Sequence, residues 1–251
     1  MSAVFLLLFF IALFIIARKP RPVKDKKGAK INNAKLNNSE DTFEKDTLTI
    51  ATFNIQTGKN TSGERDIRRS AEIIKNADLV GIQEVYTTNH LQAIGIGTSQ
   101  TKALADTGNF NWLPCASQTR WFREHRGNLI LSKLPIYDWE IKQLPSRPGK
   151  NYRNMAISKV IWQGKPFHFI NTHLQTRHGK EEQLEAVLAE FSKYSKVILV
   201  GDFNARPNTA KLINLLKNTN VTDSLGVTNI NPDEEDRVDW ILTKGLSLIH
   251  I

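Results

Sequence analysis

The stretch KVILVGDFN, residues 196–204, decides the fold class of this chain. A short apolar, β-branched run that stops at polar, turn-forming residues predicts a β-strand. Six further segments have the same character, so a strand-rich domain is expected. The predicted strands are residues 47–54, 78–85, 127–132, 154–162, 166–174, 196–204 and 237–243.

Helical periodicity separates some of these strands. Residues 66–76 and 180–194 carry apolar side chains on one face at helical spacing, and residues 210–218 fit a third helix. Because helical and strand patterns alternate from residue 47 onward, the sequence predicts one domain of the α/β (α+β) class over residues 47–245. The chain of 251 residues is long enough for that domain and an appendage.

The N-terminus is strongly apolar. Residues 1–17, MSAVFLLLFFIALFIIA, contain no charged side chain and would span about 25 Å as a helix, against a hydrocarbon core of roughly 30 Å. Basic residues follow this run and none precedes it, which favours an uncleaved transmembrane anchor over a signal peptide. The positive charge after the span favours a single-pass protein with its C-terminal domain in the cytoplasm, and the exported side stays open as the alternative.

Residues 18–46 differ in composition from both neighbours. They carry nine basic and five acidic side chains, so they contribute +4 of the net +9, and they have few apolar side chains. This composition predicts a flexible basic linker. The remaining charge is spread over the domain without a concentrated basic stripe, which gives only a mild preference for anionic partners. The single cysteine, Cys115, excludes an internal disulfide and a cysteine-based zinc site.

Polar residues with oxygen and imidazole chemistry follow the predicted strands. If these strand ends meet at one rim of a sheet, their side chains share a pocket: Asn54, Glu84, His173, Asp202 and Asn204. Oxygen ligands suit a hard cation such as magnesium, which takes one or two carboxylates and completes its octahedron with water and substrate phosphate.

The motifs at these positions resemble those of the endonuclease/exonuclease/phosphatase superfamily. They occur in the family's order, over residues 47–245: TFNIQ (52–56), IQEV (82–85), GNLILSKLPI (127–136), NTHL (171–174), GDFNARP (201–207) and RVDWIL (237–242). The resemblance implies a four-layered α/β sandwich, in which two mixed β-sheets pack face to face with helices outside.

The resemblance also implies roles for individual residues. Glu84 would be the principal ligand of Mg²⁺ or Mn²⁺, with Asn54 supporting the metal site directly or through water. His173 would hydrogen-bond the scissile phosphate. Asp202 and Asn204 are two residues apart on an extended segment, so both side chains can face the same way. The resemblance implies that they orient and deprotonate the attacking water and hold the transition-state oxygens, with Asp202 as the candidate general base.

Further positions match the family less directly. Asp239 resembles the aspartate that orients a second, C-terminal histidine. Three residues lie where the family often places phosphate-contacting or site-shaping groups, although a surface or capping role is an equal alternative: Arg126, Asn128 and Arg153.

The C-terminus departs from the family pattern. The expected Ser-Asp-His after Asp239 is absent, and residues 246–251, LSLIHI, equal the translation of a transposon end used as a sequencing adapter. We therefore expect these residues to be adapter-derived and the domain to be incomplete. The 251-residue form would then lack the C-terminal catalytic imidazole that pairs with Asp239.

Together these features predict a membrane-tethered, monomeric, magnesium- or manganese-dependent hydrolase of phosphate esters. The substrate stays open among nucleotide, inositol phosphate, phospholipid and DNA. One alternative is a DNA endonuclease or exonuclease of the same superfamily. Another is a non-catalytic, membrane-tethered binding module, against which the joint presence of Glu84, His173, Asp202 and Asn204 argues.

Overall fold

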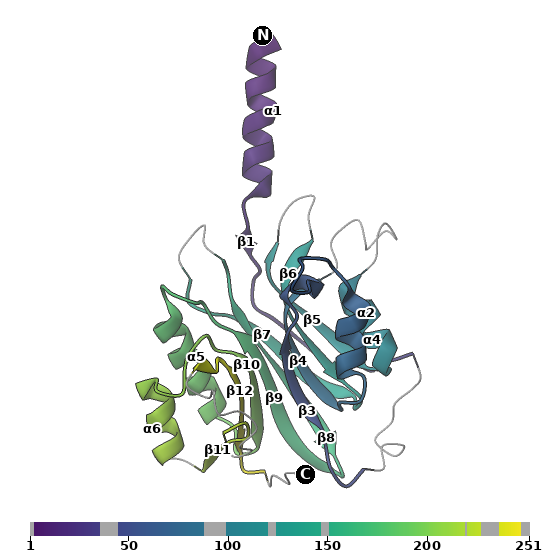
Figure 1. Ribbon diagram of the computed structural model, residues 1–251, viewed down its shortest axis with the longest axis vertical. Helices are drawn as coiled ribbons and strands as arrows, with labels where there is room; N and C mark the ends of the chain where they lie inside the picture. Colours follow the sequence, from purple (N-terminus) through teal and green to yellow (C-terminus); the bar gives the residue numbers. More distant parts are fainter. Residues whose placement is uncertain are drawn as a thin grey trace.

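The computed structural model describes residues 3–35, 45–87, 99–119, 124–146, 151–218, 220–226 and 236–246. Two β-sheets pack face to face, and helices cover their outer faces (Figure 1). Both sheets are mixed, because each contains one parallel pair among antiparallel neighbours. The predicted α/β sandwich is therefore confirmed.

The first sheet has five strands in the order β1-β5-β6-β4-β3. Their bounds are β1 Arg21–Pro22, β3 Ile50–Asn54, β4 Leu79–Thr87, β5 Asn111–Thr119 and β6 His125–Ser132. The 3₁₀ turn η2 Gln56–Gly58 and the helices α2 Ile67–Ile74 and α4 Gln100–Gly108 accompany this sheet. An apolar cluster that includes Ile74, Leu104 and Leu131 lies beneath α2 and α4.

The second sheet has seven strands in the order β11-β12-β10-β9-β8-β7-β2. Their bounds are β2 Lys26–Gly28, β7 Ile136–Gln143, β8 Asn154–Trp162, β9 Lys165–His173, β10 Val197–Asp202, β11 Val221–Asp223 and β12 Asp239–Lys244. Helices α5 Lys180–Ser192 and α6 Ala210–Asn218 accompany it, with Leu184, Phe191 and Leu212 in their shared core.

A third apolar cluster fills the space between the sheets. It joins Leu79 and Ile130 of the first sheet to Val200 and Phe169 of the second. Gly81 sits at this interface, where a Cβ atom would lie 2.4 Å from the Val200 side chain. The sheets are therefore in van der Waals contact directly below the ends of β3, β4, β9 and β10.

All seven predicted strands and three predicted helices exist, with small shifts at their ends. Of the elements in the described segments, five strands and one helix were not predicted: β1, β2, β5, β7, β11 and α4. Among these, β5 contains Pro114 and Cys115, and β7 alternates charged and aromatic residues, so neither reads as an apolar run.

The N-terminal helix α1 covers Ala3–Arg18, 16 residues, and projects away from the sandwich along the long axis of the molecule (Figure 1). Nothing in the described part of the chain forms a helix that combines the length and the apolar character needed to cross a membrane. The predicted transmembrane helix is therefore not confirmed.

The segment expected to be a flexible linker instead joins both sheets. Strand β1 pairs with β5 at the edge of the five-stranded sheet, and β2 pairs with β7 at the edge of the seven-stranded sheet. Ile31 then forms a bridge with Ile136. We call residues 21–33 the strap. The polar composition of this segment did not predict these strands, because a segment can form backbone hydrogen bonds to the edge of a sheet with few apolar side chains of its own.

Candidate active site

Strand ends from both sheets meet at one end of the sandwich. In the seven-stranded sheet, Asp202 at the end of β10 pairs with His173 at the end of β9 and with Asp239 at the start of β12. Asn54 ends β3 in the other sheet, and its Nδ2 donates to Asp202 Oδ2 at 3.0 Å. The predicted convergence of these strand ends is therefore present in the structure.

Glu84 owes its position to an irregularity in β4. The register between β4 and β6 shifts between Ile82 and Val85, and Glu84 has a φ of 57°, in the left-handed region. Such a conformation costs of order 1–3 kcal/mol for a residue with a Cβ, and it is concentrated at functional sites. The carboxylate forms an ion pair with Arg126, and Oε1 lies 4.0 Å from His173 Nδ1.

His173 is a neutral hydrogen-bond donor. Burial, then the charges of Arg153 and Arg126, hold the pKa of His173 well below 6.5. Arg153 Nη1 lies 2.9 Å from His173 Nδ1, and a guanidinium can only donate, so Nδ1 accepts and Nε2 carries the hydrogen. Burial also lowers the pKa of Arg153 to about 10, which leaves it charged at neutral pH. The Nε2 atom lies 3.5 Å from Asp202 Oδ2.

The two carboxylate oxygens of Asp202 have different partners. Oδ1 accepts from the Asn204 backbone N–H at 2.9 Å, while Oδ2 accepts from Asn54. Gly201 precedes it with a φ of 145°, and a Cβ there would lie 2.0 Å from the Thr172 carbonyl oxygen. Only glycine therefore allows β10 to approach β9 closely enough to bring Asp202 beside His173.

Asn204 does not lie as predicted. Strand β10 ends at Asp202, and Asn204 has a φ of 49°, so strand alternation does not place the two side chains on one face. Instead, Asn204 Nδ2 donates to the Leu174 carbonyl at 2.9 Å, and the Asn204 carbonyl accepts from Lys180 Nζ. In this structure Asn204 fixes the turn that follows the strand.

Asp239 is beside Asp202 and is poorly satisfied. Its Oδ1 is buried and has no hydrogen-bond partner among the described residues. Burial, reinforced by the charge of Asp202 and opposed by Arg237, raises the pKa of Asp239 to about 6. The predicted orienting role needs an imidazole partner. His250 lies outside the described residues.

The three residues of uncertain role all line a small cavity of about 60 Å³ next to Glu84. Arg126 and Arg153 place positive charge there through their contacts with Glu84 and His173. Asn128 is buried and donates its Nδ2 to Asn154 Oδ1 at 3.0 Å, so this amide is already used to join β6 to β8.

The oxygen groups of the site fit a hard cation. No cluster of three His, Cys, Asp or Glu side chains suited to a metal is found in the described residues. Magnesium does not require one, because it is commonly held by one or two carboxylates, with water and phosphate as its other ligands. Glu84 supplies a carboxylate of that kind, and Asn54, at the end of the adjacent strand, has an amide oxygen that accepts from the Gln56 N–H at 3.1 Å.

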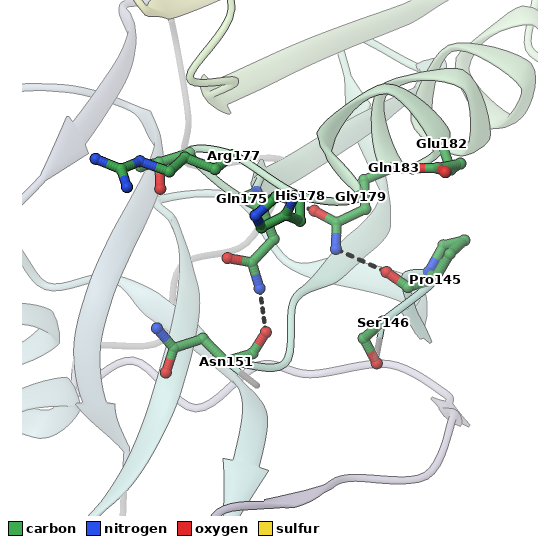
Figure 2. A pocket seen from close by; sticks show the side chains of 10 residues that line it. Pro145, Ser146, Asn151, Gln175, Arg177, His178, Gly179, Glu182 and Gln183 are labelled. Carbon is green, nitrogen blue, oxygen red and sulfur yellow. Dashed lines mark hydrogen bonds between the residues drawn. The ribbon is translucent and has the colours of Figure 1, made fainter. Parts of the chain in front are cut away.

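A larger cavity of about 330 Å³ adjoins the site and shares Asn151 with the small one. Figure 2 shows Gln175 and Gln183 next to each other, with hydrogen bonds to the carbonyls of Asn151 and Pro145 respectively. The buried amide of Gln183 accepts from the Gln175 N–H at 2.9 Å and donates to the Pro145 carbonyl at 2.7 Å. It thereby holds two loops that form the cavity wall.

The sequence motifs also contain two buried amides, Gln83 and Asn171, for which the sequence alone predicted no role. Gln83 Nε2 donates to Asn171 Oδ1 at 2.7 Å, and Asn171 Nδ2 donates to the carbonyls of Ile82 and Leu129 at 3.1 and 3.0 Å. This pair joins β4 to β9 next to the site, because Gln83 directly precedes Glu84 and Asn171 lies two residues before His173. The available signal was an amide within an otherwise apolar strand, because a buried polar group needs partners.

A sequence model described as the Endonuclease/Exonuclease/phosphatase family matches residues 51–250. No curated protein sequence matches the chain significantly. Similar solved structures include a mannosyl-6-phosphatase from Bacteroides thetaiotaomicron, with 16% identity, a TM-score of 0.58, and coverage of 79% of this chain and 85% of that chain. A conserved protein of unknown function from Enterococcus faecalis has 20% identity and a TM-score of 0.59, with coverage of 79% and 88%. A β-hairpin deletion mutant of Staphylococcus aureus beta toxin has 19% identity and a TM-score of 0.54, with coverage of 80% and 88%. These likenesses are at the level of the fold.

Proposed function

Because this chain belongs to the endonuclease/exonuclease/phosphatase family, we propose that it is a divalent-cation-dependent hydrolase of phosphate esters, in which water attacks phosphorus. One observation carries the proposal. Side chains from five strands of the two sheets, together with Arg153 directly before β8, meet within hydrogen-bond or ion-pair distance. They combine a carboxylate base, a neutral imidazole donor and two guanidinium groups: Asn54, Glu84, His173, Asp202, Arg126 and Arg153.

In this proposal Asp202 accepts the proton of the attacking water. Its two oxygens are held by the Asn54 amide and the Asn204 N–H, so the carboxylate is fixed before substrate arrives. The His173 Nε2–H then donates to a phosphoryl oxygen, and it can do so at neutral pH because its lowered pKa keeps the imidazole uncharged with a defined tautomer. Arg153 holds that tautomer and adds positive charge.

Glu84 and Asn54 are the proposed ligands of Mg²⁺ or Mn²⁺. The cation would neutralise phosphate charge at the reacting centre. Glu84 is suited to this role because its side chain is partly exposed, at 19%, beside the cavity that Arg126 and Arg153 also line.

The test compares Glu84→Gln and Asp202→Asn with Glu72→Gln, whose carboxylate lies on the surface of α2 in an ion pair with Lys75. With magnesium present, we expect each site variant to lose roughly 100-fold or more in turnover of a soluble phosphate ester, and the surface variant to retain it. Turnover that persists in excess chelator would refute the proposal. Duplex DNA, a sugar phosphate, an inositol phosphate and a phospholipid as parallel substrates separate a nuclease from a phosphatase or phosphodiesterase. Binding to one of them without turnover would indicate a binding module.

We also propose that the natural chain differs from this one after Gly245. The adapter match of residues 246–251 supports this, as does the buried Asp239 Oδ1, which has no hydrogen-bond partner within the described ranges. An independent genomic clone should diverge from LSLIHI near Leu246 and encode a Ser-Asp-His whose imidazole pairs with Asp239. A stop codon directly after Ile251 in genomic DNA would refute it. The activity test is therefore run on both forms.

Attachment to a membrane through α1 is the last part of the proposal. Its support is the run of exposed apolar side chains from Val4 to Ile15. Carbonate extraction of cell membranes tests it: the protein should stay in the membrane pellet, and its release into the supernatant would contradict attachment.

A further inference from the structure

The chain leaves α1 at the rim of the candidate active site. Helix α1 ends at Arg18, and β1 begins three residues later, where Arg21 pairs with Thr119 and Pro22 with Gln118. The Val23 N–H donates to the Ser117 carbonyl at 3.2 Å. Ser117 and Gln118 are themselves wall residues of the cavity that contains Glu84 and Arg126. The helix and the catalytic pocket therefore lie at the same end of the sandwich.

The strap fixes this arrangement. After β1, Asp25 Oδ1 accepts from the Gln143 N–H at 2.7 Å, β2 pairs with β7, and Ile31 exchanges two backbone hydrogen bonds with Ile136. The strap thus runs along the edges of both sheets, from the pocket end toward the opposite end. Because both sheets hold it, the point at which α1 leaves the domain is set by the fold.

The surface of α1 and the charge next to it fit a lipid surface. In the described part of the chain, all exposed large apolar side chains but Ile73 lie on α1. An apolar surface of this size marks an interaction site. Residues 19–24, between α1 and β2, then carry three basic side chains and no acidic one. Basic side chains next to an anionic membrane are attracted to its surface.

We propose that α1 and residues 19–24 hold the protein on an anionic membrane with the catalytic pocket facing the lipid headgroups, and that the substrate is a phosphate ester of a membrane lipid. The substrate assignment rests on the proposed hydrolase activity. The orientation rests on the proposed membrane attachment and does not require that activity. A pocket held at the membrane surface meets headgroup phosphates at high local concentration, whereas a pocket at the far end of the sandwich would meet soluble esters.

Site-directed fluorescence tests the orientation without requiring turnover. Cys115 is fully buried, so one introduced cysteine can be labelled selectively in the full chain. Glu124→Cys places the dye two residues from Arg126, at the pocket end. Lys165→Cys places it at the start of β9, the nine-residue strand that ends at His173, about 27 Å away. Both positions are exposed.

The labelled proteins are reconstituted with phosphatidylcholine and phosphatidylserine vesicles that contain a headgroup-spin-labelled lipid. We expect the fluorescence quenching of the dye at position 124 to be roughly three times that of the dye at position 165, or more. The reason is that the range of the quencher is shorter than the length of the domain. Equal quenching, stronger quenching at position 165, or no vesicle association would overturn the proposed orientation.

A second measurement tests the substrate. Leu8→Glu combined with Phe10→Glu changes two exposed side chains of α1 and leaves the domain intact. We expect turnover of a soluble phosphate ester to be unchanged and turnover of vesicle phospholipid to fall roughly tenfold or more. Unchanged vesicle turnover, or hydrolysis of the soluble ester alone by the parent chain, would overturn the lipid assignment. If the parent chain and its longer genomic form turn over neither substrate, the proposed function itself fails, and the quenching contrast still decides the orientation.

Discussion

Asn171 offers a direct test of how the two sheets are held in register at the site. Its side chain is fully buried between them and makes three hydrogen bonds, with Gln83 Nε2 and with the carbonyls of Ile82 and Leu129. Asn171→Ala removes all three. Gln83 Nε2 keeps two other acceptors, Thr52 Oγ1 and the Gly81 carbonyl, so its loss is partly compensated.

The size of the effect follows from this count. The two bonds to the carbonyls contribute about 1 kcal/mol net each, and the bond from Gln83 is replaced by its other acceptors. The two carbonyls left without a donor add a desolvation penalty of about 1–3 kcal/mol in total. We therefore expect Asn171→Ala to lower the free energy of unfolding by about 3–5 kcal/mol, a large part of the 5–15 kcal/mol typical of a domain. Because Asn171 joins the strands that carry Glu84 and His173, the proposed activity should fall as well.

Urea unfolding followed by tryptophan fluorescence measures the change. The midpoint should fall while the slope with urea stays the same, since the buried surface hardly changes. Ser158→Ala is the matched control: it removes one buried hydrogen bond, to the Phe169 carbonyl at 3.3 Å, and should cost about 1 kcal/mol or less. A loss for Asn171→Ala that does not exceed the loss for Ser158→Ala would refute the argument.

Three further predictions concern the site and the strap. Gly201→Ala should destabilise the domain by about 3 kcal/mol or more, because its Cβ would collide with the Thr172 carbonyl; thermal unfolding measures this, and a shift below about 3 °C would contradict it. The pKa of Asp239, raised to about 6 from 3.8, means that the folded state binds its proton more tightly, so stability falls as pH rises from about 4 to 6. Asp239→Asn should therefore raise stability at pH 7 by about 1–2 kcal/mol, after allowance for solvent screening, and the gain should vanish near pH 3. Finally, deletion of residues 1–18 should leave the unfolding midpoint of the domain unchanged. Deletion of residues 1–35 should lower the midpoint, because it removes an edge strand from each sheet. Equal midpoints would show that the strap contributes nothing to the stability of the domain.

The sequence by itself determined the fold class and most of the site. Apolar strands that end in a carboxylate, amide or imidazole are local patterns, and the parallel pairs β3–β4 and β9–β10 carry their ends to one rim of the sandwich. Glu84, His173 and Asp202 could therefore be selected from short motifs. Each of these motifs depends only on neighbours in the chain, which is the information that a single sequence contains.

The tertiary structure alone decided three other features. The left-handed φ of Glu84 and the turn at Asn204 depend on how β4 and β10 meet their neighbours, and the strand-alternation argument for Asn204 was wrong for that reason. The tautomer of His173 depends on Arg153, which lies 20 residues away in sequence. The polar segment at residues 21–33 forms a strap because two sheet edges offer it backbone partners. These features come from contacts between distant segments, and neither composition nor periodicity encodes which distant backbone will be adjacent.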